Sequence, residues 1–314
     1  MRWALLGTGR IAARSLLPAL AAAGQQVVRV GSRDPDRAGA FAEEHGIPSA
    51  GDYGDAIAAD DVEAVYLPLP NALHEAWATA ALEAGKHVLC EKPLATDAAA
   101  AARMQAAAQR SGRLLMEAAM VRYHPRTEAL LDLVWDGAIG PLRWMSAAFS
   151  FPMTRADDIR ADPDLGGGAL LDIGFYTAAI SRWLARDEPE VVAASGEVSG
   201  RGVDVATASL LRFPGGATAA LRAGFDAPLH QEVTVVGADG VLRVPKAFTA
   251  GAADDAVLLR DDVPIMTVRA DPFERMVRAF ADAAETGTPA PLDPADAIAT
   301  ARVLDAIRAA AFPA

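Results

Sequence analysis

Residues 3–12 have the sequence WALLGTGRIA, and this stretch decides the fold. Its apolar start, residues 3–6, predicts a buried strand, and the alanine-rich residues 10–23 that follow predict a helix. Between them, Gly7 and Gly9 allow a tight turn in which a pyrophosphate can approach the N-terminus of the helix. Gly-x-Gly also occurs in many turns that bind nothing, but the position at the first strand–helix junction strengthens the motif. We therefore predict a dinucleotide site at Gly7, Thr8, Gly9, Arg10 and Ile11.

Strands and helices continue to alternate up to about residue 120. Short apolar runs occupy residues 26–30, 64–67, 87–90 and 114–116, and helical patterns occupy residues 35–45, 53–59, 72–84 and 98–110. This alternation indicates a parallel, doubly wound sheet. We predict a Rossmann-type dinucleotide-binding domain at residues 1–120.

The pattern changes after residue 120. A helix at 126–135, a strand at 142–151 and a Gly-rich segment precede seven strand-like runs between residues 191 and 268, which turn sequences separate. Neighbouring strands with short turns favour an antiparallel sheet, and two helices near residues 272–285 and 294–311 close the sequence. We predict a second, α+β domain at residues 121–314, with a large, mainly antiparallel open sheet and a C-terminal helix that is able to pack back on the first domain.

The composition excludes several classes of function. The 314 residues include 29 Lys and Arg against 41 Asp and Glu, a net charge of −12, which argues against nucleic-acid or anionic-membrane partners. No apolar run approaches the ~20 residues of a membrane-spanning helix. The single cysteine, Cys90, permits neither an internal disulfide nor a Cys-based zinc site, and we expect no metal. Because Arg10 and Arg14 interrupt the only segment that imitates a signal peptide, we expect a cytoplasmic protein.

The end of the second predicted strand distinguishes NADP from NAD. NAD-specific folds usually place an acidic residue there to bind the ribose 2′-hydroxyl, whereas this chain has Ser32 and Arg33, which suit a 2′-phosphate. Asp34 follows directly. It is consistent with NAD, with an ion pair to Arg33, or with a cap of the next helix ahead of Pro35. We predict NADP, with NAD as the alternative.

The segment KHVLCEKPLA, residues 86–95, ends a buried strand on a charged side chain. Lys92 follows the strand at the sheet edge where ligands of parallel sheets bind, and Pro93 keeps its backbone out of the helical region. Glu91 offers a carboxylate that can orient the ammonium group. The alternative is a surface lysine at a strand end.

The segment GGGALLDIGFY, residues 166–176, supplies a second pair of polar groups. Asp172 and Tyr176 are four residues apart and share one face of a helix, in apolar surroundings. A buried carboxylate there is costly unless it is paired, and a lysine near both groups would pair with Asp172 and assist the phenol. The alternative is a helix-capping aspartate beside a tyrosine of the core.

With these residues identified, the sequence resembles the glucose–fructose oxidoreductase and inositol dehydrogenase superfamily over nearly its full length. The resemblance rests on GTGRIA (7–12), YLPLPNALHEAWATAALEAGKHVLCEKPL (66–94), MEAAMVRYHP (116–125), IRADPDLGGGALLDIGFY (159–176) and the β-rich remainder. The motifs SRD, PLPN and EKPL are similar to those of the branch that contains NADP-dependent D-xylose dehydrogenases and dimeric dihydrodiol dehydrogenases.

The resemblance implies that the second domain binds substrate and that its open sheet forms a homodimer or a higher homo-oligomer. It implies a cis peptide bond between Lys92 and Pro93, with Lys92 beside the nicotinamide and the substrate hydroxyl, and a catalytic helix that carries Asp172 and Tyr176. The cofactor contacts that it implies are Leu67, Pro68, Asn71, His74, Glu91, Lys92, Pro93 and Arg160. Phe175 departs from the small residue common in relatives, which leaves the identity of the sugar open.

The reaction that these implications predict is hydride transfer between NADP and a hydroxyl-bearing carbon of a sugar or cyclic diol, of the aldose 1-dehydrogenase or dihydrodiol dehydrogenase type. Tyr176 accepts the hydroxyl proton with help from Lys92 and Asp172, or Lys92 is itself the base. Two alternatives stay open: a non-catalytic NADP-binding sensor or regulatory protein, and a redox-assisted glycoside hydrolase. The intact proton relay argues against the sensor, and the Ser32–Arg33 pair argues against the hydrolase.

Overall fold

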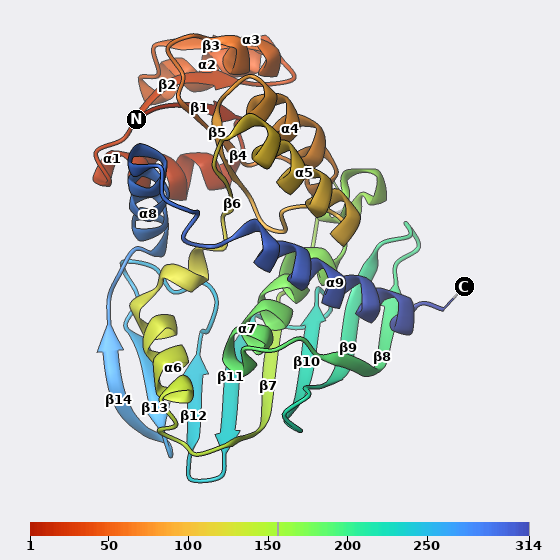
Figure 1. The fold of residues 1–314 in the computed structure, drawn as a ribbon. Helices are drawn as coiled ribbons and strands as arrows, with labels where there is room; N and C mark the ends of the chain where they lie inside the picture. Colours follow the sequence, from red (N-terminus) through yellow and green to blue (C-terminus); the bar gives the residue numbers. More distant parts are fainter. Residues whose placement is uncertain (156, 314) are drawn as a thin grey trace. The chain divides into compact units, whose positions relative to one another are not determined.

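The computed structural model describes residues 1–155 and 157–313, which form two compact units (Figure 1). The first unit contains Met1–Met120 and Phe273–Ile298, and the second contains the described residues of Val121–Pro272 and Ala299–Ala314. The helix α8 (Pro272–Thr286) is therefore part of the first unit although it lies near the end of the sequence. Its contacts there include the ring of Phe280 against that of Trp3, with centroids 5.2 Å apart.

The first unit is built on a six-stranded sheet in the order β3-β2-β1-β4-β5-β6, and all its strands are parallel. The strands are β1 (Arg2–Leu6), β2 (Gln26–Gly31), β3 (Ser49–Gly51), β4 (Ala64–Leu67), β5 (His87–Cys90) and β6 (Leu115–Glu117). The helices between them are α1 (Leu17–Ala22), α2 (Pro35–His45), α3 (Tyr53–Ala58), α4 (His74–Glu83) and α5 (Ala98–Ser111). This strand order confirms the predicted doubly wound fold.

Two local features of the first unit were not predicted from the sequence. β3 has only three residues and no run of large apolar side chains, so it was not predicted. The helix after the Gly-rich turn begins with a π-helical turn, η1 (Ala12–Leu16), before α1. Pro18 lies in the first turn of α1 and has no N–H to donate, which interrupts the regular α-helical hydrogen bonding there.

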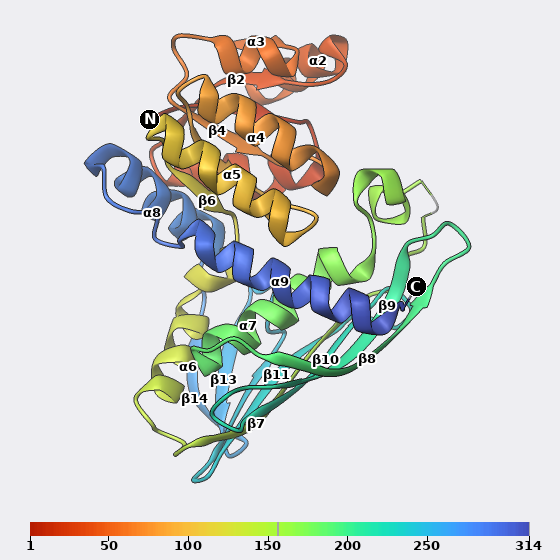
Figure 2. The same cartoon turned by 45° about the vertical axis from the view of Figure 1, so that its right-hand side comes forward.

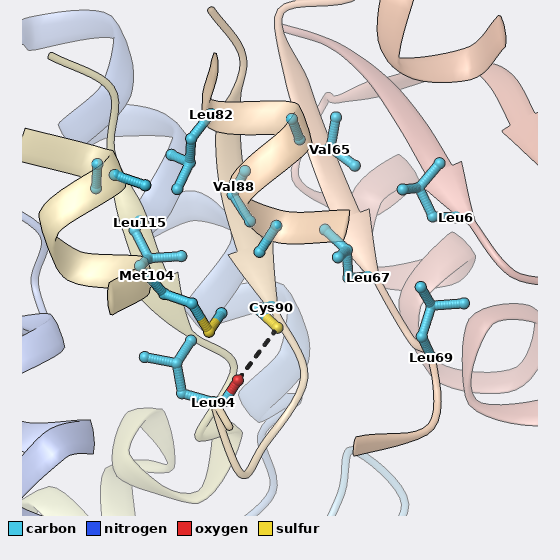
Figure 3. Packing of buried hydrophobic residues seen from close by; sticks show 14 of the residues in the cluster. Leu6, Val65, Leu67, Leu69, Leu82, Val88, Cys90, Leu94, Met104 and Leu115 are labelled. Carbon is cyan, nitrogen blue, oxygen red and sulfur yellow. Dashed lines mark hydrogen bonds between the residues drawn. The ribbon is translucent and has the colours of Figure 1, made fainter. Parts of the chain in front are cut away.

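A core cluster of the first unit packs against one face of β4 and β5, through Val65, Leu67, Val88 and Cys90. Figure 3 shows Leu82 of α4, Met104 of α5 and Leu115 of β6 around Val88 and Cys90. The Cys90 thiol is buried and lies 3.9 Å from the carbonyl oxygen of Leu94. Burial raises the pKa of this thiol, so Cys90 is an inert part of the core.

The second unit contains an eight-stranded sheet in the order β14-β13-β12-β11-β7-β10-β9-β8. Its strands are β7 (Leu142–Ser150), β8 (Glu190–Val198), β9 (Asp204–Arg212), β10 (Thr218–Gly224), β11 (His230–Gly237), β12 (Val241–Pro245), β13 (Ala256–Arg260) and β14 (Val263–Val268). Every neighbouring pair is antiparallel except β7 and β10, which are parallel because β7 inserts between β10 and β11 from far away in sequence. The predicted mainly antiparallel sheet is confirmed.

Helices cover one face of this sheet. In Figures 1 and 2, α6 (Pro125–Trp135) and α7 (Phe175–Ala185) lie on the same side of the strands. The last helix, α9 (Pro294–Ala311), runs from the first unit into the second. In residues 1–155 and 157–313, no helix combines the length and the apolar character needed to cross a membrane.

Candidate active site

The Gly-rich turn follows β1 and approaches the end of β4 closely. Gly7 has a φ of 122°, and a Cβ placed there would lie 3.3 Å from Cδ2 of Leu69 and 3.4 Å from the carbonyl oxygen of Pro68. Only glycine accepts this conformation and this contact without strain. Two residues later, the carbonyl oxygen of Gly9 accepts the N–H of Ala12 and so begins the first helical turn. The predicted residues Gly7 and Pro68 thus lie side by side at the carboxyl edge of the sheet.

At the end of β2, Asp34 caps α2. Its carboxylate accepts the N–H groups of Asp36 and Arg37, and its own N–H is donated to the hydroxyl of Ser32. Of the alternatives that the sequence left open for Asp34, the structure shows the helix cap. Arg33 is exposed beside it.

The turn after β5 holds Glu91 and Lys92. The Lys92–Pro93 peptide bond is cis, as the family resemblance implied. Glu91 accepts a hydrogen bond from the hydroxyl of Tyr66 through Oε1, and from the backbone N–H of Lys92 at 3.1 Å through Oε2. Glu91 therefore fixes the backbone of the turn from which the Lys92 side chain leaves.

His74 lies beneath the same turn. Its side chain has no exposed surface, and its Nδ1 and Nε2 atoms lie 2.9 Å from the carbonyl oxygens of Pro93 and Leu69. Burial lowers the pKa of His74, although the backbone contacts oppose this effect. His74 thus links the segments that follow β4 and β5. Of the residues predicted to contact the cofactor, it is one that supports the backbone. Asn71, three residues earlier, begins the short 3-10 helix η2 (Asn71–Leu73) and is half-buried.

In the second unit, Asp172 has a partner that sequence reasoning did not assign to it. The carboxylate accepts a hydrogen bond from Nε of Arg160 at 2.5 Å, and Arg160 also contacts Asp158 at 3.2 Å. Burial acts to lower the pKa of Arg160, but the two carboxylates outweigh it and raise the pKa. The guanidinium group also lies 5.8 Å from the centroid of the Phe151 ring. Arg160 therefore stays charged and orients Asp172.

The consecutive glycines before the helix make this ion pair possible. A Cβ at Gly167 would lie 2.4 Å from the carbonyl oxygen of Arg160, and a Cβ at Gly168 would lie 2.1 Å from a carboxylate oxygen of Asp204. The missing side chains let the N–H of Gly168 reach the carbonyl of Arg160 at 2.9 Å. The chain segment that carries Arg160 is thereby held against the start of the Asp172 helix.

Asp172 and Tyr176 follow each other along one helical stretch. Asp172 lies in a π-helical turn, η6 (Leu170–Gly174), and Tyr176 lies in the first turn of α7. The Tyr176 ring is 9% exposed, and its centroid lies 5.4–5.6 Å from those of the aromatic rings of Phe149, Phe175 and Phe248. The tyrosine is therefore fixed by packing. Phe175 is 1% exposed, so its ring belongs to the core.

Sequence reasoning missed Glu117 and Tyr66, which both contact the turn that carries Lys92. Glu117 ends the buried strand β6 on a charge, which is the pattern that identified Lys92 at the end of β5. In the described part of the chain, no group of three or more His, Cys, Asp or Glu side chains is arranged to hold a metal ion.

Comparisons with known proteins extend over both units. Residues 1–119 match the model of an oxidoreductase family with an NAD-binding Rossmann fold, and residues 127–243 match the GFO/IDH/MocA C-terminal domain. D-xylose 1-dehydrogenase (NADP(+)) 2 of Haloferax volcanii is 38% identical, covering 98% of this chain and 96% of its own. Trans-1,2-dihydrobenzene-1,2-diol dehydrogenase of Mus musculus is 34% identical over 79% of this chain and 75% of its own.

The fold of this chain is also similar to that of a solved enzyme structure. A 3-ketoreductase from Actinomadura kijaniata, in complex with NADP and TDP-benzene, superposes with a TM-score of 0.92 at 36% identity, covering 99% of this chain and 98% of the other. Structures of a Tyr→Phe variant and of a Lys→Ala variant of that enzyme are similar to this chain as well.

Proposed function

Because the chain belongs to the GFO/IDH/MocA family of oxidoreductases, we propose that it transfers hydride between NADP and a hydroxyl-bearing carbon of a sugar or cyclic diol. As a member of this family, the protein is a nicotinamide-dependent dehydrogenase that acts on CH–OH groups. Beyond this, we propose NADP as the cofactor and a sugar or cyclic diol as the substrate. The similarity to the D-xylose and dihydrodiol dehydrogenases supports both.

One observation carries the catalytic part of the proposal. The Asp172–Arg160 ion pair is partly buried and lies one helical turn before Tyr176, in apolar surroundings. Removing two charges from water costs several kcal/mol, and the attraction within the ion pair offsets only part of this cost. Such pairs therefore often occur at functional sites. A positioned carboxylate beside a phenol is suited to moving a proton.

The first unit fits a dinucleotide. The left-handed Gly7 and its close approach to Pro68 leave no room for a side chain where a pyrophosphate would lie, and Ser32 and Arg33 follow β2 where a 2′-phosphate would lie. We assign Gly7, Thr8, Gly9, Arg10 and Ile11 to the pyrophosphate, and Leu67, Pro68, Asn71 and the Glu91–Pro93 turn to the nicotinamide half. When bound, NADP supplies the hydride acceptor for oxidation.

The remaining chemistry belongs to the protein. Tyr176, ionised to the phenolate with the help of the Lys92 charge, accepts the proton of the substrate hydroxyl as the C–H hydride leaves, which converts the alcohol to a carbonyl. Lys92 stabilises the negative charge on the Tyr176 oxygen and on the substrate oxygen. Asp172, held by Arg160, orients these proton-transferring groups. In the alternative assignment, Lys92 takes the proton instead of Tyr176. Substitutions of Lys92 and Tyr176 distinguish the two assignments.

The proposal is tested by following reduced-nicotinamide absorbance with NADP and then NAD across aldoses, inositols and a trans-dihydrodiol. Turnover with NADP is the expected result. Tight NADP binding without turnover of any substrate would favour the sensor, and cofactor retained through purification would favour the glycoside hydrolase. A second candidate, reduction of a keto group on a dTDP-linked sugar, is favoured by the similarity to the 3-ketoreductase and to a dTDP-sugar 3-reductase from Actinomadura kijaniata. A dTDP-keto sugar with NADPH tests it in the same assay.

Replacing Arg33 with alanine is expected to lower the preference for NADP over NAD by about 10- to 150-fold. A charge-assisted hydrogen bond contributes roughly 1.5–3 kcal/mol, and each 1.4 kcal/mol is tenfold in affinity. The measurement is the ratio of kcat/KM with the two cofactors. Arg110→Ala is the matched control, because Arg110 is exposed on α5, where it forms an ion pair with Glu83 at 3.7 Å. An unchanged ratio would remove Arg33 from the 2′-phosphate site.

We also propose that the open face of the eight-stranded sheet joins two copies of this chain. Trp144 on β7 and Leu210 on β9 lie on the same face and are 44% and 42% exposed. Exposed apolar side chains on a wide sheet are typical of protein interfaces. Light scattering is expected to give a dimer or larger, and a Trp144→Asp/Leu210→Lys double variant is expected to shift it toward the monomer. A wild-type monomer at micromolar concentration would contradict the proposal.

A further inference from the structure

The turn that carries Lys92 is held by side chains from three other elements. The backbone N–H of Leu94 is donated to Oε1 of Glu117 at 2.6 Å, at the end of β6. On the same turn, the Pro93 carbonyl faces His74 at 2.9 Å, and Glu91 is bound by Tyr66 of β4. Buried side chains thus hold the Glu91 side chain before Lys92 and the backbone of Pro93 and Leu94 after it.

Glu117 is the most unusual of these supports. Its side chain is 2% exposed, and a carboxylate in such a place is costly unless it accepts strong hydrogen bonds. The sheet sets its position, because Glu117 is paired with Cys90 in the parallel register and the N–H of Ala118 is donated to the Cys90 carbonyl at 2.7 Å. The carboxylate therefore lies beside the last residue of β5, where the turn begins.

We propose that Glu117 is a positioning residue for the reaction: it fixes the Glu91–Leu94 turn so that the Lys92 side chain leaves the sheet edge in one direction. This inference rests on the proposed function of Lys92. Glu117 acts through the backbone of Leu94 and does not touch the substrate. His74, which contacts Pro93, supports the same turn from α4.

The test compares Glu117→Ala with Glu117→Gln. Alanine removes the acceptor, and a misplacement of about 1 Å in a catalytic group can lower the rate by on the order of 100-fold. We expect kcat per NADP-binding site to fall by about 10- to 100-fold in Glu117→Ala, with KM for NADP changed less than about threefold. Glutamine keeps an oxygen for the Leu94 N–H, so Glu117→Gln is expected to retain most of the activity. Glu83→Ala, an exposed carboxylate of α4, is the control.

An activity-independent measurement separates this inference from the proposed function. Hydrogen exchange of peptides that cover residues 91–95 is expected to accelerate in Glu117→Ala but not in Glu83→Ala, because the Leu94 amide loses its acceptor. If Glu117→Ala does not fold, His74→Phe is expected to show the same local acceleration and the same fall in kcat. Unchanged exchange in Glu117→Ala, or in His74→Phe where Glu117→Ala does not fold, would overturn the positioning role. An equal loss of kcat in the Glu117→Gln and Glu117→Ala variants would overturn it as well. Absence of turnover in the wild type with accelerated exchange in Glu117→Ala would refute the proposed reaction alone.

Discussion

Lys92→Ala is expected to lower kcat by about 10²- to 10⁴-fold, which is the range for a group that assists proton transfer. The backbone of the turn does not depend on the lysine side chain, because Glu91, His74 and Glu117 hold it through other atoms. The variant should therefore fold and bind NADP with little change in affinity. Loss of kcat with unchanged NADP binding would place the effect in the chemical step.

The controls for Lys92 test charge and location separately. Lys92→Arg keeps the positive charge but carries a larger, planar group, so we expect partial activity if Lys92 acts electrostatically and none if it exchanges a proton, since arginine stays protonated. Lys246→Gln alters a lysine of the second unit that forms an ion pair with Asp254, and it should leave kcat unchanged. Activity of Lys92→Ala within tenfold of the wild type would remove Lys92 from the reaction.

Much of the fold could be predicted from sequence because its signals are local. Apolar runs followed by helical patterns predicted every strand of the first sheet except β3, and the helix Pro35–His45 was predicted to the residue because Asp34, Pro35 and Gly46 mark its ends. The parallel pairing of β7 with β10 was not predictable in this way. It depends on a strand that enters the middle of the sheet from a distant part of the chain, and periodicity carries no information on that choice.

The site residues that could be predicted are those whose residue type alone indicates a chemical role. Lys92 and the Asp172–Tyr176 pair were found because each breaks an apolar pattern. The partner of Asp172 was missed, because the eleven residues between Arg160 and Asp172 fold back through glycines whose close contacts only the structure reveals. Glu117 was missed because its contact is with the backbone N–H of Leu94, in the turn after the neighbouring strand β5, and such contacts leave no characteristic spacing in the sequence.

Tyr176→Phe is expected to lower kcat by about 10²- to 10⁴-fold if the Tyr176 phenolate takes the substrate proton. The phenylalanine ring keeps the contacts with Phe149, Phe175 and Phe248, so the free energy of unfolding should change by no more than about 1 kcal/mol. Tyr123→Phe is the matched control, because Tyr123 is equally buried in the same unit and has no role in the proposed reaction. Denaturant unfolding and steady-state kinetics are measured on both variants.

The double variant Lys92→Ala/Tyr176→Phe decides which group is the proton acceptor. If both residues act in one proton transfer, their effects are not additive, and the double variant should be about as slow as the slower single variant. If Tyr176 is the acceptor, Tyr176→Phe is the slower single variant, and Lys92→Arg retains part of the activity because a positive charge alone assists the phenolate. If Tyr176→Phe stays within tenfold of the wild type while Lys92→Arg is inactive, the proton passes to Lys92 instead. Fully additive losses would contradict a shared step and leave Asp172, held by Arg160, as the group to test as the base.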